Sequence, residues 1–168
     1  MSMYLTEIQN YYQGLCESHT DIQHNLNGRT AFFRLQGFGA LPQLPNNPGD
    51  VLVMMERFNG QAVGEFDANK LRQNITLRFA NYLTTPEGGD FEAAIDECMG
   101  QCLLIMFDFI SKMRTDYLAD DCGWLKYVDF PSISWSEFDG PLIENHYGWD
   151  LNIPFRASFP AYRSDKWI

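Results

Sequence analysis

The sequence predicts an α+β domain in which an antiparallel sheet of about five to six strands is covered by one long helix, with a short helix at the N-terminus. Three observations lead to this fold class. Residues 89–118 carry apolar side chains at helical spacing, apolar runs of strand length lie on both sides, and turn residues separate those runs. With 168 residues, 45% of them hydrophobic, the chain can form one packed domain over 1–168.

The long helix has the clearest pattern. It follows the glycine pair before Asp90, and Asp90 is placed to cap its N-terminus. Apolar residues recur at spacings of three and four from Phe91 to Tyr117, while Asp108 and Lys112 are spaced to form an ion pair. Further apolar residues fall outside this stripe: Leu103, Leu104, Ile105 and Phe107. We therefore expect the helix to be covered by the sheet on one side and by a neighbour on another.

The other elements follow from shorter patterns. A helix is predicted over residues 4–16, and strands are predicted over 31–35, 51–58, 61–66 and 75–83. Two more strands are predicted after the long helix: one over 125–130 and 132–135 with a break at Pro131, and a last one over 142–143 and 149–159. Asn59-Gly60 is expected to form a type I′ turn that joins the second and third strands. Pro154 indicates an edge or a bulge in the last strand, because proline has no amide hydrogen to donate.

Residues 36–50 are predicted to form an extended, proline-rich arm, since its prolines exclude a central strand. The arm also carries the apolar residues Phe38, Leu41 and Leu44. These side chains either contact a neighbouring subunit or fold back on the chain's own core, and the sequence leaves both interpretations open. The tail 160–168 is expected to be loosely held.

The chain has a net charge of −10, and most of the imbalance lies near the long helix. Residues 87–121 hold nine acidic and two basic side chains. Asp96, Glu97, Asp120 and Asp121 are predicted to form an acidic surface, for which a merely solvated face is the alternative interpretation. Such a surface repels phosphate backbones, which argues against a groove-reading DNA-binding protein but not against a protein that DNA passes.

No catalytic, cofactor-binding or metal-binding residues are predicted. The four cysteines include no Cys-x-x-Cys pair, and we interpret them as reduced, structural thiols of a protein made in a cytosol. His146, near Glu144 and Asp150, is a candidate general base, with a structural turn histidine as the alternative. No apolar run approaches the roughly 20 residues of a membrane span, so no membrane partner is expected.

The predicted order of elements resembles that of the tail-terminator and tail-completion proteins of tailed bacteriophages, which cap the tail tube as a ring where it meets the head. The matching pieces cover nearly the whole chain: 4–15, 31–35, the hairpin around Asn59-Gly60, 75–83, 89–118 and the strands after Leu125. The resemblance depends on topology rather than on a motif, and other neck, connector or tail-tube ring proteins share this order.

The resemblance implies a structural subunit, without an active site, that joins or caps the tail tube in the virion after assembly in the host cytoplasm. It implies a homo-oligomeric ring, for example a hexamer, in contact with tail-tube and connector or portal-side proteins, with DNA passing but not specifically bound. The expected subunit contacts are Phe38, Leu41, Leu44, Leu104 and Phe107. The alternative function is a small acidic binding or immunity-type protein that neutralises a basic partner.

Overall fold

A computed structural model describes residues 2–34, 50–56, 59–63, 70–84, 89–138 and 145–158 of the chain. The helices are α1 (Ser2–Ser18) and α2 (Phe91–Ala119). The strands are β1 (Phe32–Arg34), β2 (Val51–Met55), β3 (Asn59–Val63), β4 (Lys70–Tyr82), β5 (Ser134–Glu137) and β6 (His146–Ser158). The predicted α+β class, with one long helix and a short N-terminal helix, is confirmed.

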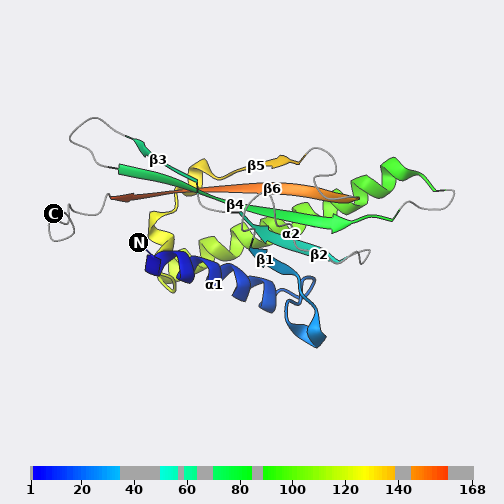
Figure 1. The fold of residues 1–168 in the computed structure, drawn as a ribbon, viewed down its shortest axis with the longest axis horizontal. Helices are drawn as coiled ribbons and strands as arrows, with labels where there is room; N and C mark the ends of the chain where they lie inside the picture. Colours follow the sequence, from blue (N-terminus) through cyan, green and yellow to red (C-terminus); the bar gives the residue numbers. More distant parts are fainter. Residues whose placement is uncertain are drawn as a thin grey trace, which may run out of the picture.

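The sheet has the order β1-β2-β4-β6-β5, and β3 pairs with β4 beyond the end of β2 (Figure 1). The six described strands therefore occupy five positions across the sheet. β1 pairs with β2 in parallel, whereas the other pairs are antiparallel, so the sheet is mixed. The parallel pair is possible because residues 35–50 separate β1 from β2, which is enough chain to return in the same direction.

The tight turn predicted at Asn59-Gly60 is wrong. Both residues lie inside β3, Asn59 does not adopt a positive φ, and β3 pairs with β4 rather than with β2. β2 and β3 run in the same direction along β4, and the register shifts by one residue between them, because Met55 pairs with Leu77 and Asn59 with Asn74. An Asn-Gly pair permits a type I′ turn without requiring one, and long strand pairing overrides it here.

The strand predicted over 125–130 is also wrong. The chain forms two 3₁₀ turns instead, at Leu125–Tyr127 and Phe130–Ser132, and Val128 makes an isolated bridge to Phe155. Leu125 and Val128 are buried at a spacing of three, which suits a tight turn better than the alternation of a strand. β5 begins only after these turns and overlaps the predicted segment 132–135 at Ser134 and Trp135.

Pro154 lies in the part of β6 that β5 does not reach. β6 is central, with β4 on one side and β5 on the other, but β5 reaches only as far as the Ser134–Asn152 pair. The carbonyl oxygen of Pro154 accepts a hydrogen bond from the Asp129 amide at 2.9 Å, on the side where β5 has ended. Proline is tolerated there because its missing N–H leaves no gap in the ladder with β4.

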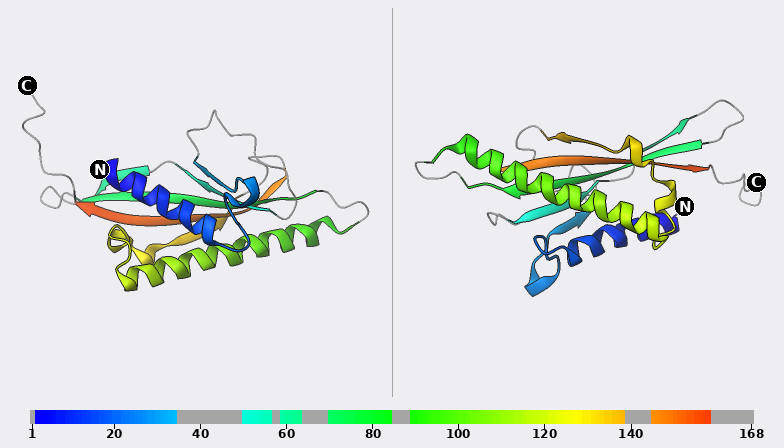
Figure 2. Two further views of the ribbon diagram at one scale, coloured as in Figure 1. Left: turned by 90° about the horizontal axis from the view of Figure 1, so that it is seen from below. Right: turned by 180° about the vertical axis from the view of Figure 1, so that it is seen from behind.

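The two helices have different positions relative to the sheet. α2 lies across one face, and in the views of Figure 2 it runs along β4 and β6, while α1 lies beside the β1 edge. Phe109 of α2 packs edge-to-face on Phe79 of β4, with ring centroids 5.0 Å apart. α1 reaches the C-terminal half of α2, where Tyr11 donates a hydrogen bond of 2.8 Å to Asp116.

The ends of α2 follow the predicted signals. The Asp90 side chain accepts hydrogen bonds from the amides of Glu92 and Ala93, as an N-cap does. The helix ends at Asp120, whose left-handed φ of 57° closes the last turn. Lys112, however, pairs with Asp116 rather than with the predicted Asp108. Asp116 is nearly buried, so its carboxylate is poorly hydrated and gains more from a neighbouring cation.

Gly148 allows β4 and β6 to approach each other closely. A Cβ at this position would lie 1.8 Å from the backbone carbonyl oxygen of Phe79. We predict that Gly148→Ala lowers the free energy of unfolding by about 3 kcal/mol, because the two central strands must separate. Urea unfolding followed by circular dichroism measures this change.

Gly14→Ala is the matched control. Gly14 lies inside α1, and a Cβ there meets no atom within 4 Å. Because alanine favours the helix, this variant should be stabilised by about 0.5–1 kcal/mol. Equal stabilities of the two variants would contradict the close approach at Gly148.

Candidate functional site

Three exposed apolar side chains form a patch on α2 and β5. Leu104 is 68% exposed, Phe107 37% and Trp135 46%. The rings of Phe107 and Trp135 pack edge-to-face with centroids 5.4 Å apart, so the patch joins the outer side of α2 to the edge strand of the sheet. We refer to Leu104, Phe107 and Trp135 as the α2/β5 patch.

The patch follows from the local patterns of its two elements. Ile105, Met106 and Phe109 take the inner side of α2, which leaves Leu104 and Phe107 outside, as the sequence predicts. The expectation that Ile105 also falls outside the stripe is wrong, because this side chain is buried in the core. Trp135 lies between Ser134 and Ser136 on β5 and is opposite Leu151 of β6. Trp135 was not predicted as a surface residue, although the Ser-Trp-Ser-Glu alternation is a signal for a strand with one apolar face.

A separate open hollow of about 440 Å³ lies between α1 and α2, lined by Leu15, Ser18, His19, Thr20, Asp108, Phe109 and Lys112. Both ring nitrogens of His19 are engaged. Nδ1 accepts from the Asp21 amide at 3.2 Å, and Nε2 lies 3.3 Å from an Asp108 carboxylate oxygen. The ring therefore donates from Nε2 to Asp108, and the titratable side chains of the hollow surround an apolar floor formed by Leu15 and Phe109.

The predicted acidic residues do not form one surface. Asp96 and Glu97 are exposed near the start of α2, and Asp120 and Asp121 are exposed after its end. Along a helix, this separation is about 36 Å. The structure thus divides the predicted acidic surface into two small clusters at opposite ends of the helix.

The structure does not bring His146 and Asp150 together as a catalytic pair. His146 is buried with its ring centroid 5.2 Å from that of Tyr82, and four strand residues place Asp150 about 13 Å away. Both Asp150 oxygens accept from Arg78, at 2.7 and 2.8 Å, and this hydrogen bonding raises the pKa of the Arg78 guanidinium. Glu144 lies outside the described residues.

The described thiols are free and mostly buried, and burial raises the pKa of the Cys16 thiol well above its usual range.

Within the described ranges, no three His, Cys, Asp or Glu side chains are close enough together to hold a metal ion. Neither α1 nor α2, the helices of the described part, has the length and apolarity needed to cross a membrane. The predicted contacts Phe38, Leu41 and Leu44 lie outside the described residues, as does the tail 160–168.

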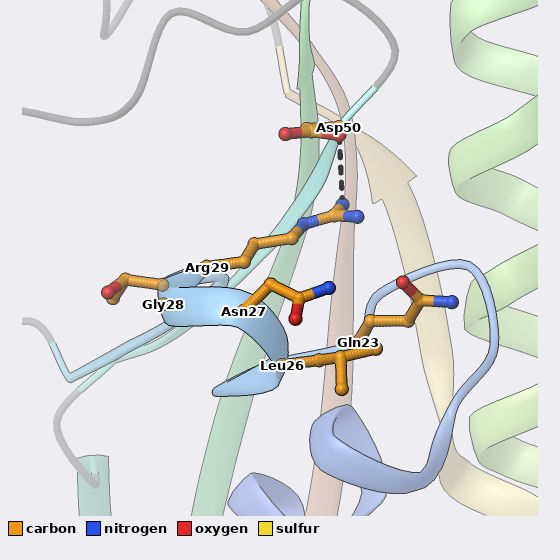
Figure 3. Close-up of a pocket in the computed structure, with 7 residues that line it drawn as sticks. Gln23, Leu26, Asn27, Gly28, Arg29 and Asp50 are labelled. Carbon is orange, nitrogen blue, oxygen red and sulfur yellow. Dashed lines mark ion pairs between the residues drawn. The ribbon is translucent and has the colours of Figure 1, made fainter.

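A second hollow of about 470 Å³ lies beside the loop between α1 and β1 (Figure 3). It is lined by Gln23, Leu26, Asn27, Gly28, Arg29, Thr30 and Asp50. The Arg29 guanidinium is 3.2 Å from Asp50, and the remaining polar side chains are amides and a hydroxyl. This set can form hydrogen bonds, and its one carboxylate, Asp50, is engaged by Arg29.

The same loop is held to β1 by His24. Its Nδ1 accepts hydrogen bonds from the amides of Ala31 and Phe32, at 3.1 and 3.3 Å. Three non-glycine residues of the loop have positive φ: Gln23, Asn25 and Asn27. His24 therefore fixes a strained loop only while its ring is neutral.

A comparison with protein families, curated proteins and solved structures found no match to the chain. Functional inference therefore depends on the geometry of the described residues, among which the α2/β5 patch joins exposed apolar side chains from two elements.

Burial lowers the pKa of His24 below its ordinary value of 6.5, so stability should depend on pH. The unfolded chain binds a proton near pH 6.5, whereas the folded chain binds it only at lower pH. The free energy of unfolding is therefore retained above about pH 6.5 and falls as the pH decreases below it. Urea unfolding between about pH 7.5 and 5 measures this decrease.

His24→Asn is the control, because the asparagine Oδ1 can accept at the Nδ1 position without titrating. His19 and His146 are common to both proteins, so the difference between their pH profiles reports His24 alone. Parallel profiles would contradict the assigned role.

Proposed function

We propose that the chain is a structural subunit that assembles with copies of itself into a ring, in the neck or tail position that the resemblance to tail-terminator proteins suggests. The α2/β5 patch is the observation that supports assembly most directly. Leu104, Phe107 and Trp135 remain exposed although the inner side of α2 is already buried against the sheet. A long helix with a second apolar side is what a subunit needs if a neighbour completes its burial.

The size of the patch suits an interface between subunits. Burying one leucine or aromatic side chain stabilises a contact by roughly 1.5–3 kcal/mol. Three such residues therefore offset part of the free-energy cost of association, which comes from lost translational and rotational entropy. In a ring each copy makes two contacts, and closure adds to the stability of each.

The charge distribution favours this proposal over the acidic binding protein. A protein that neutralises a basic partner needs its acids on one continuous surface, whereas Asp96 and Glu97 are separated from Asp120 and Asp121 by the length of α2. Clusters at the two ends of a helix are compatible with a ring whose channel repels DNA without binding it. Negative-stain images of the assembled protein would show such a channel.

We predict that Leu104→Glu weakens self-association by at least about tenfold, because a charge replaces the most exposed apolar side chain of the patch. Light scattering coupled to size-exclusion chromatography, over a wide concentration range, measures the mass of each species. The control is Asn10→Glu, which adds the same charge at an exposed position of α1.

Wild type and Asn10→Glu should form the same closed oligomer, while Leu104→Glu should remain smaller at equal concentration. A wild-type protein that stays monomeric at the highest concentration, and shows no rings in negative stain, would contradict the proposed function.

A further inference from the structure

Three strands in the described part of the chain pair on one side only: β1 with β2, β3 with β4 and β5 with β6. At β1 the outward amide of Phe32 is already bonded to Nδ1 of His24 at 3.3 Å, so β3 and β5 are the edges considered for a partner. All four residues of β5 are exposed. Free edges are templates for strand addition, so they indicate how a neighbour could bind.

The outward-facing groups of β5 can be assigned from its register. The Phe138 amide donates to the carbonyl of Gly148, so Phe138 turns its backbone groups toward β6. In an antiparallel ladder this direction alternates along the strand. Ser134 and Ser136 therefore bond to β6, while the N–H and C=O groups of Trp135 and Glu137 face away from the sheet.

The same reasoning applies to β3. The Glu56 amide donates to the Thr76 carbonyl, so the even-numbered residues of β4 turn their backbone groups toward β2 and β3. Asn74 and Arg72 are the partners of Asn59 and Gln61, which therefore bond to β4. Gly60 and Ala62, which directly follow these two residues, turn their N–H and C=O groups outward.

The two edges match each other in spacing and lack the usual protection. Each edge presents outward-facing N–H and C=O groups on two residues that have one residue between them. These are Trp135 and Glu137 on β5, and Gly60 and Ala62 on β3. Natural edge strands are commonly blocked by lysine or proline. Neither β3, with the sequence Asn-Gly-Gln-Ala-Val, nor β5 contains one.

The charges of the two edges are complementary. Along β4, Lys70 and Arg72 hold the register positions opposite Val63 and Gln61 of β3. On the other edge, β5 ends at the exposed Glu137 and contains no basic residue. The sequence therefore places positive charge next to β3 and negative charge on β5, which favours contact between unlike edges of two copies.

We propose that β5 of one copy pairs with β3 of the next, so that the sheet continues from subunit to subunit. This inference rests on the proposed self-assembly and names the groups that carry it. The contact is heterologous, because each copy uses a different edge on each side. A strand added next to β5 also lies beside Trp135, so the ladder and the α2/β5 patch form one interface.

The first test blocks one edge. Glu137→Pro removes an outward amide while leaving the bonds of β5 to β6 intact, and proline is tolerated at such edge positions. Glu137→Ala is the matched control, because it loses the same carboxylate and keeps the amide. We expect Glu137→Ala to assemble and Glu137→Pro to lose closed oligomers, with at least about tenfold weaker association.

The second test uses complementation. Ala62→Pro blocks the β3 edge, with Ala62→Ser as its control. Each proline variant retains one intact edge, so each alone should be monomeric, and an equimolar mixture should form a dimer that grows no further. Native mass spectrometry of the mixture, with one variant isotopically labelled, identifies the dimer as mixed.

Hydrogen exchange of the wild type provides a measurement that does not depend on how the variants fold. The amides of Trp135, Glu137, Gly60 and Ala62 should exchange at least about tenfold more slowly at assembling concentrations than after dilution. The Ser136 amide, already bonded to β6, should change little and serves as the internal control.

The outcomes separate the two proposals. If Glu137→Pro assembles as well as Glu137→Ala, or if Ala62→Pro alone still forms dimers through β5 of two copies, the β3–β5 contact is overturned while self-assembly stands. A monomeric wild type overturns both proposals.

Discussion

The pairing of β4 with β6 is the constraint on which the other elements depend. The two strands stay in register from Lys70–Ser158 to Tyr82–His146, which makes them the longest pair of the sheet. Gly148 allows their backbones to approach, and the Arg78–Asp150 ion pair joins them on the face opposite α2. α2 is attached to the same ribbon, since the Trp149 indole donates to the carbonyl of Met99 at 3.0 Å.

A long central pair with short neighbours leaves parts of its edges uncovered. β2 and β3 divide the outer side of β4 between them, with a register shift where they meet, and β5 covers only the stretch from Trp149 to Asn152 on β6. The remaining backbone groups of β6 on that side are partly satisfied by the 3₁₀ turns, as the Asp129–Pro154 hydrogen bond shows. The exposed edges and the patch at Trp135 are therefore consequences of unequal strand lengths.

The sequence predicts the elements whose signals are local and misplaces those that depend on distant partners. The periodicity of α2, its cap at Asp90 and its stop at Asp120 lie within a few residues of the structure they specify. By contrast, Asn59-Gly60 is part of a strand because residues 73–74 of β4 pair with it. Lys112 pairs with Asp116 because α1 helps to bury that carboxylate. Neither preference can be read from neighbouring residues alone.

The candidate site likewise contains residues that the sequence could predict and one that it could not. Leu104 and Phe107 could be predicted to be exposed, because the number of apolar residues on α2 exceeds what one helix face can bury. Trp135 could not be assigned to the same surface, because only the register of β5 on β6 and the crossing of α2 bring it to Phe107.

The interface inferred here is small, and its size explains why closure matters. Two outward residues on each edge, with Leu104, Phe107 and Trp135 beside them, give a weak contact between two isolated copies, since association costs translational and rotational entropy. An open chain of copies would also leave one β3 edge and one β5 edge exposed at its ends. A closed ring leaves neither edge free. Edge strands that would promote aggregation if they stayed exposed are then paired within the ring, and the assembly stops at a defined size.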